Sequence, residues 1–63
     1  MNEAADISVT EAIRAMEPGQ SEFFRGGSPL SIRAIVSRVR KEFRSRKYHT
    51  EALRHGVEVW RLR

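Results

Sequence analysis

Arginine and lysine are the residues of this 63-residue chain whose types and spacing point most directly to chemistry. Residues 28–63 carry ten Lys and Arg against three Glu, a net charge of +7, whereas residues 1–27 carry five acidic and two basic side chains, a net charge of −3. Such an asymmetry is typical of proteins that bind a polyanion. The competing interpretation is a well-solvated surface, because Lys and Arg are common on small domains.

The spacing of the basic residues favours a binding surface. On a helix, Arg33, Ser37, Arg40 and Arg44 fall together on one flank with Lys41 beside them, while Arg38 lies apart. A guanidinium fork suits phosphate and guanine, and a major groove admits a helix. The sequence therefore predicts a nucleic-acid interface composed of Arg33, Ser37, Arg40, Lys41, Arg44, Arg46, Lys47 and Arg54.

Residues for catalysis or metal binding are nearly absent. The chain has no cysteine, and His49 and His55 stand six residues apart with no carboxylate pair at ligand spacing. No nucleophile elbow, phosphate loop or dinucleotide fingerprint is present. Gly26-Gly27-Ser28 could bind a phosphate at a helix start, but a turn followed by a helix cap is the simpler interpretation. We expect no enzyme activity, no catalytic or metal-binding residue and no cofactor.

The chain also lacks sequence signals for membranes. It begins without the basic and apolar regions of a signal peptide, and no apolar run approaches the roughly 20 residues of a membrane span. We therefore expect a soluble, cytoplasmic protein with no membrane partner.

The first half of the chain predicts a short helix and a strand. Ser8-Val9-Thr10-Glu11 matches a capping box, an apolar stripe follows, and Glu17-Pro18-Gly19 ends it, so we expect a helix over about 9–16. Residues 1–7 are expected to be flexible. The aromatic run 21–25 predicts a strand whose adjacent Phe23 and Phe24 face opposite sides.

The second half predicts a long helix and a hairpin. Ser28-Pro29 is a good start for a helix reaching about Ser45, with a core face of Ile32, Ile35, Val36, Val39 and Phe43. Two alternating segments around His55-Gly56 then predict an antiparallel hairpin. A two-residue turn there would place Ala52 opposite Val59 and Glu51 opposite Trp60. Tyr48, Thr50, Ala52, Val57 and Val59 would share one face, and His49, Leu53, Trp60 and Leu62 the other.

Together these elements predict one α+β domain over residues 1–63: short helix, strand, long helix and β-hairpin, with a small three-stranded antiparallel sheet packed on the long helix. We expect Trp60 in the core, because so small a domain needs its largest apolar side chain there. An exposed Trp60 would instead stack on a base or anchor a protein partner. A cationic helix before a basic hairpin is winged-helix-like by analogy only, since a single short helix precedes the strand.

Several short motifs resemble small accessory proteins of tailed bacteriophages and prophages. They stand here as Ala12-Ile13…Met16…Gly19-Gln20-Ser21, Ser31-Ile32-Arg33…Ser37-Arg38, Arg46-Lys47-Tyr48-His49-Thr50 and the closing Gly56-Val57-Glu58-Val59-Trp60-Arg61. The resemblance covers most of the chain from Ala12 onward. It implies a viral protein acting inside a bacterial host cell, where such proteins bind DNA or disable a host protein.

Two functions remain open at this level. The first is nucleic-acid binding, with double-stranded DNA as the expected partner. The second is an inhibitor or adaptor whose basic surface docks on an acidic host protein. A homodimer is compatible with either function, because the predicted core is small.

Overall fold

Two helices and three strands make up the described part of the chain, which covers residues 3–63 in the computed structural model, with side chains from Ser8 onward. In order they are α1 (Glu3–Ala15), β1 (Ser21–Arg25), α2 (Pro29–Glu42), β2 (Tyr48–Leu53) and β3 (Gly56–Arg61). The predicted α+β domain with two helices and a three-stranded antiparallel sheet is confirmed, but the first helix is not short, since α1 spans 13 residues and α2 14.

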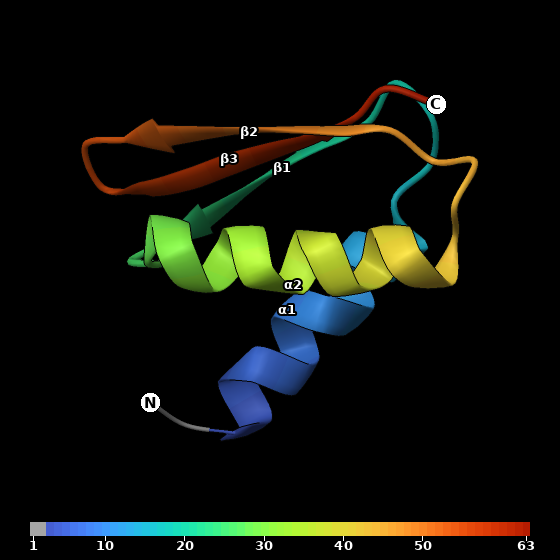
Figure 1. Cartoon of the computed structure of the whole chain (residues 1–63). Coiled ribbons are helices and arrows are strands. Elements are labelled where there is room, and N and C mark those ends of the chain that lie inside the picture. The colour runs from blue at the N-terminus through green and yellow to red at the C-terminus, as the bar shows by residue number, and fades with distance from the viewer. Residues whose placement is uncertain (1–2) are drawn as a thin grey trace.

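The sheet is antiparallel with strand order β1-β3-β2, so the last strand of the chain lies in the middle. Figure 1 shows α2 lying along one face of the sheet and α1 crossing α2, with the N-terminal part of α1 pointing away from the sheet. The C-terminal end of α1 reaches the sheet, where its Ile13 carbonyl accepts a hydrogen bond from the Tyr48 hydroxyl of β2. No helix of the described chain covers the other face (Figure 1). A single helix separates β1 from the hairpin, so the likeness to a winged helix stays an analogy.

The core lies between α2, the end of α1 and the central strand. Its buried members are Ile13, Met16, Ile32, Ile35, Val36, Val39, Val57 and Val59, and Val9, Phe24, Phe43 and Tyr48 pack at its margin. The predicted apolar faces of both helices and of the hairpin are confirmed. Of the two adjacent phenylalanines, Phe24 reaches this core and Phe23 points to the other side of the sheet.

Both helices differ from prediction at one end. Helix α1 begins at Glu3, because glutamate and alanine are strong helix formers, and Ser8 therefore lies inside it and not at its N-cap. Residues 1 and 2, part of the segment predicted to be flexible, lie outside the described residues. Helix α2 starts as predicted, with Ser28 as N-cap and Pro29 as the first helical residue, but it ends at Glu42. Phe43 leaves the helical conformation (φ −123°, ψ 80°) and packs on the core, so Arg44 lies beyond the helix.

The predicted hairpin register is wrong by two residues. Leu53 pairs with Gly56 across a turn at Arg54 and His55, and Ala52 pairs with Val57 instead of Val59. A shift of two leaves every side chain on its predicted face, because side chains alternate with a period of two. The glycine is needed inside the strand and not in the turn, since a Cβ at position 56 would collide with the Phe24 carbonyl oxygen of β1.

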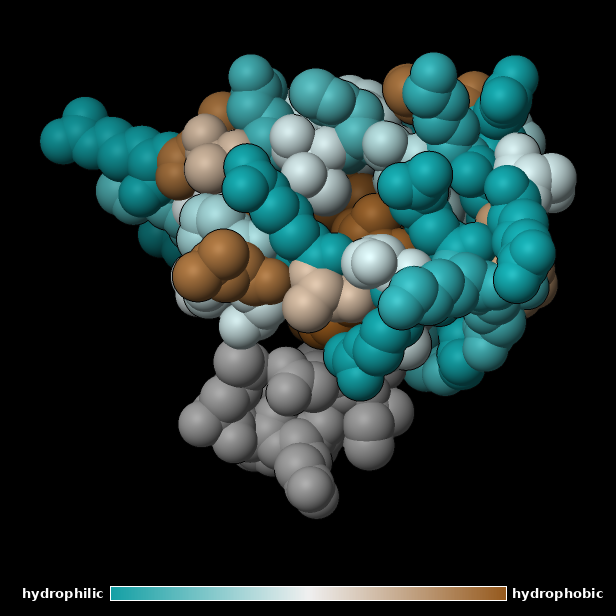
Figure 2. All heavy atoms as spheres, in the orientation of Figure 1, coloured by the Kyte–Doolittle hydropathy of each residue, from teal (hydrophilic) through white to brown (hydrophobic). Residues whose placement is uncertain are grey.

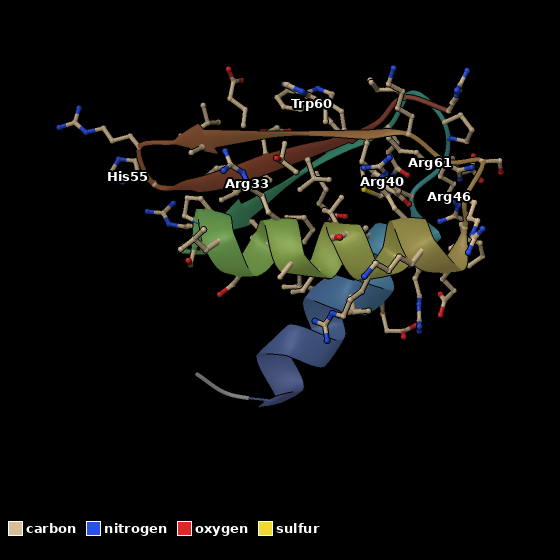
Figure 3. The ribbon with its side chains drawn as sticks, viewed as in Figure 1. Arg33, Arg40, Arg46, His55, Trp60 and Arg61 are labelled. Atoms are coloured by element: carbon tan, nitrogen blue, oxygen red, sulfur yellow. The ribbon has the colours of Figure 1, made fainter. Side chains whose placement is uncertain are left out.

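The predicted core position of Trp60 is also wrong. Trp60 belongs to the face of β3 opposite Val57 and Val59, and Figure 3 shows its ring on the side of the sheet away from the helices. It is half-buried there and lies beside His49, with ring centroids 5.3 Å apart.

Candidate nucleic-acid interface

The predicted basic flank of α2 lies beside the edge strand β2. Arg33, Ser37 and Arg40 are all exposed, and Figure 3 shows both arginines rising from α2 toward the sheet. Seven residues of helix place the two Cα atoms about 10 Å apart along the axis. The sequence could predict this placement because the opposite face of α2 is committed to the core.

A hollow of about 190 Å³ separates α2 from β2 at this point. It is lined by Arg33, Val36, Ser37, Arg40, Tyr48 and Thr50. Figure 2 shows it as a recess with hydrophobic atoms at its floor and hydrophilic side chains around its rim. Sequence reasoning missed Tyr48 and Thr50 as lining residues, because their contribution depends on which strand lies at the edge of the sheet.

The free edge of β2 adds backbone hydrogen-bonding groups to the hollow. The Leu62 amide donates to the Lys47 carbonyl oxygen at 2.7 Å, so Lys47 directs its carbonyl toward β3. Because hydrogen-bonded and non-bonded pairs alternate in an antiparallel ladder, the N–H and C=O groups of Tyr48 and Thr50 point outward. The guanidinium groups of Arg33 and Arg40, the hydroxyls of Ser37 and Thr50 and these outward amides thus surround one recess, and all of them can donate to phosphate oxygens.

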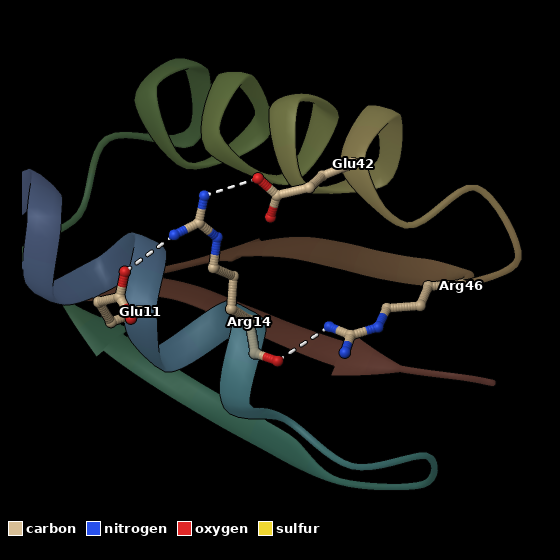
Figure 4. A network of polar contacts seen from close by, with 4 residues as sticks. All are labelled: Glu11, Arg14, Glu42 and Arg46. Atoms are coloured by element: carbon tan, nitrogen blue, oxygen red, sulfur yellow. Dashed lines mark hydrogen bonds and ion pairs between the residues drawn. The ribbon is translucent and has the colours of Figure 1, made fainter.

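No carboxylate neutralises this flank in the part of the chain that the structure describes. Glu42, the one acid in α2, binds Arg14 of α1 at 2.8 Å on another side of the helix, and Arg14 also contacts Glu11 at 3.0 Å (Figure 4). The hydrogen bond and charge of Glu42, followed by those of Glu11, raise the pKa of Arg14 above its ordinary value. The Arg14–Glu42 ion pair therefore joins the two helices, and Arg33 and Arg40 have no acidic partner among the described residues.

The remaining predicted residues continue the positive surface toward both ends of α2. Lys41 is exposed on α2 itself, and Arg44 and Lys47 are exposed on the connection to β2. Arg54 is exposed in the hairpin turn, at the other end, where it lines an open recess of about 530 Å³ with Arg25 and His55. The prediction missed Arg25 and His55, since β1 and the hairpin turn meet only in the folded chain.

Arg46 differs from the other predicted residues because its guanidinium is engaged inside the fold. Its Nη1 donates to the Arg14 carbonyl oxygen at 2.9 Å and to the Tyr48 hydroxyl at 3.0 Å, and its Cζ lies 3.9 Å from the centre of the Phe43 ring. Arg61 donates similarly from Nη1 to the Met16 carbonyl oxygen at 2.7 Å. Both arginines donate hydrogen bonds to carbonyl oxygens at the end of α1, which the helix itself leaves without a partner. Arg46 therefore has a structural role that its position in the sequence does not indicate.

Replacing Arg46 with alanine should therefore lower stability more than nucleic-acid affinity. Loss of a half-buried guanidinium that makes two hydrogen bonds should cost about 2 kcal/mol of the free energy of unfolding. Urea denaturation would measure this cost, and Arg44→Ala is the matched control, expected to change stability by less than about 0.5 kcal/mol. A stable Arg46→Ala variant with sharply weakened nucleic-acid binding would contradict the assignment.

The described residues contain no group of three or more His, Cys, Asp or Glu side chains that could hold a metal ion. Within the same part of the chain, no helix has both the length and the apolar character needed to cross a membrane.

Comparison with known proteins identifies no relative of this chain. No protein-family model matches the chain, and neither the curated proteins nor the solved structures give a significant match.

Proposed function

We propose that the protein binds nucleic acid, with double-stranded DNA as its partner, through the basic strip formed by Arg33, Ser37, Arg40, Lys41, Arg44 and Lys47. One observation carries this proposal. Arg33 and Arg40 stand on either side of a donor-rich recess without an acidic partner among the described residues, while Glu42 is held by Arg14.

The side chains on the exposed side of α2 favour duplex DNA over other polyanions as the partner. Leu30, Ala34, Ser37 and Lys41 lie along its outward line, and Leu30 is 79% exposed. Small or flexible side chains on that line let a helix approach base edges in the major groove, where an apolar side chain can contact a thymine methyl group. The flanking arginines would then hold the phosphates and fix the orientation of the helix.

Salt dependence of binding tests the proposal. Fluorescence anisotropy with a labelled mixed-sequence duplex should show an affinity that falls steeply as salt rises. If the five cations of the basic strip all contact phosphates, the slope of log K against log salt should approach about −4.5. Absence of binding at low salt, or a slope near zero, would contradict it.

The setting of this function is also a proposal, namely the cytoplasm of a bacterial host cell. It rests on the resemblance of the sequence motifs to small bacteriophage accessory proteins. The alternative function, in which the basic strip docks on an acidic host protein, predicts a stoichiometric complex that survives nuclease treatment of a host lysate. The nucleic-acid proposal predicts that the same treatment releases the bound material.

A further inference from the structure

The face of the sheet that no helix covers is rich in apolar side chains. Of the large hydrophobic residues that the described chain exposes, three lie here: Phe23 at 41%, Leu53 at 46% and Leu62 at 52% exposure. Trp60 lies on the same face (Figure 3), and the ring of His49 is next to it, tilted by 41°. Clustered exposed apolar residues of this kind are typical of surfaces that bind a partner.

Two carboxylates stand at the centre of this face. Glu51 of β2 and Glu58 of β3 are directly opposite each other, and Phe23 of β1 flanks Glu58 in the same row. Neither glutamate lies within ion-pair distance of a basic group among the described residues. Like charges opposite each other weaken a sheet, so this arrangement costs stability in the isolated domain. A cationic partner would reverse that cost.

These charges exclude two simple occupants of the open face. Phosphates of a nucleic acid would be repelled by Glu51 and Glu58. In a symmetric dimer with two open faces packed together, each pair of carboxylates would approach the other pair, and juxtaposed like charges at an interface are strongly unfavourable. The fitting occupant brings guanidinium or ammonium groups, which can pair with the carboxylates and lie over the Trp60 ring.

We infer that the open face binds the basic strip of a second copy of this chain, so that molecules associate head to tail. The strip supplies the missing complement, since Arg33 and Arg40 have no acidic partner among the described residues. Such an interface is heterologous, because the two surfaces in contact are different. The carboxylates of Glu51 and Glu58 then contact the basic strip at the positions that phosphates would take.

The size of the open face indicates a weak association. Six residues make a strand about 20 Å long, and three strands span about 10 Å between the outer axes. An interface this small lies at the low end of the range for specific complexes. We therefore expect self-association between about 10 µM and 1 mM, and its loss as salt rises.

A mixing experiment with two variants tests this arrangement. Glu51→Gln/Glu58→Gln removes the acidic face and keeps the basic strip, whereas Arg33→Gln/Arg40→Gln does the opposite. In sedimentation without nucleic acid, the native chain should form species that grow with concentration, and each variant alone should remain monomeric. An equimolar mixture should form dimers and nothing larger, because each variant retains one functional surface.

Three results would overturn the inference. A native chain that stays monomeric up to about 1 mM lacks the contact in the expected range. A mixture that stays monomeric shows that the two surfaces do not meet. Stronger association of Glu51→Gln/Glu58→Gln than of the native chain would indicate a symmetric contact between open faces. Circular dichroism checks that both variants fold. Arg38→Gln/Glu17→Gln, which neutralises one charge of each sign outside the two surfaces, is the control and should associate like the native chain.

Competition with DNA is a consequence that rests on the proposed function. If duplex DNA and the open face share the basic strip, adding the duplex should reduce self-association. By thermodynamic linkage, self-association must weaken the affinity for the duplex by the same factor. Self-association with no response to DNA would count against the proposed function alone, since the mixing experiment contains no nucleic acid.

Discussion

Replacing both Arg33 and Arg40 with glutamate should lower the affinity for duplex DNA by more than about 100-fold near physiological salt. Each arginine offers charge-assisted hydrogen bonds to phosphate worth about 1.5 kcal/mol or more. Losing two such contacts costs about 3 kcal/mol, which corresponds to a factor of more than 100 in the dissociation constant. The two new carboxylates add repulsion. Fluorescence anisotropy at fixed salt measures the change directly.

Position on the helix, not total charge, should decide the size of this effect. Arg38 and Arg40 are two residues apart on α2, and both are exposed, but Arg38 lines a different recess with Thr10, Arg14 and Glu42. Arg40→Glu and Arg38→Glu change the net charge equally. We expect Arg40→Glu to weaken binding by about tenfold or more and Arg38→Glu by less than about threefold. Equal losses would mean that DNA responds to net charge or contacts both sides of α2.

The sequence predicts the central part of the candidate site because packing on one side of α2 determines the other side. Four buried aliphatic residues orient the helix, so Arg33, Ser37 and Arg40 must face outward together. Helical spacing predicts Arg44 on the same flank, but the helix ends where Phe43 turns into the core. Where a helix ends depends on such tertiary contacts, which the periodicity of a single segment does not contain.

The arginines also show where sequence reasoning stops. Arg46 and Arg44 look equivalent in the sequence, yet only Arg46 meets the Arg14 carbonyl oxygen and the Tyr48 hydroxyl. That difference arises from the contact of the α1 end with the connection before β2. No pattern within residues 44–47 indicates it, so the binding and structural roles of the basic residues separate only in three dimensions.

The wrong prediction for Trp60 has a different cause, because the sequence contains the relevant signal. Trp60 alternates with Val57 and Val59, so a strand that buries both valines must turn the tryptophan to the opposite face. The expectation of a core position relied on the size of the side chain. That argument fails here because the helices cover one face of the sheet only, leaving the Trp60 face open.

Gly56 occupies the position where a single methyl group should have the largest effect on the fold. It lies in the central strand, paired with Arg25 of β1 on one side and Leu53 of β2 on the other. A Cβ there would collide with the Phe24 carbonyl oxygen and lie 2.9 Å from both the Arg25 Cα and the Phe23 Cζ. The Phe23 ring can move aside, but the backbone of β1 can yield only by separating from β3.

Gly56→Ala should therefore destabilise the protein by about 3 kcal/mol, the cost of forcing extra volume into a packed site. A chain of this length has a total stability of roughly 3 to 9 kcal/mol, so the variant should retain between roughly 0 and 6 kcal/mol. Urea denaturation followed by the fluorescence of Trp60, the single tryptophan, measures the difference.

Gly19→Ala is the control, because Gly19 has a positive φ of 85° but open space around it, and strain alone should cost about 1 kcal/mol. Equal losses for the two variants would show that β1 does not pack closely on Gly56. A much larger loss at position 56 would show that the close approach of β1 to the central strand is a main determinant of stability, in the sheet that places Tyr48 and Thr50 beside the basic flank of α2.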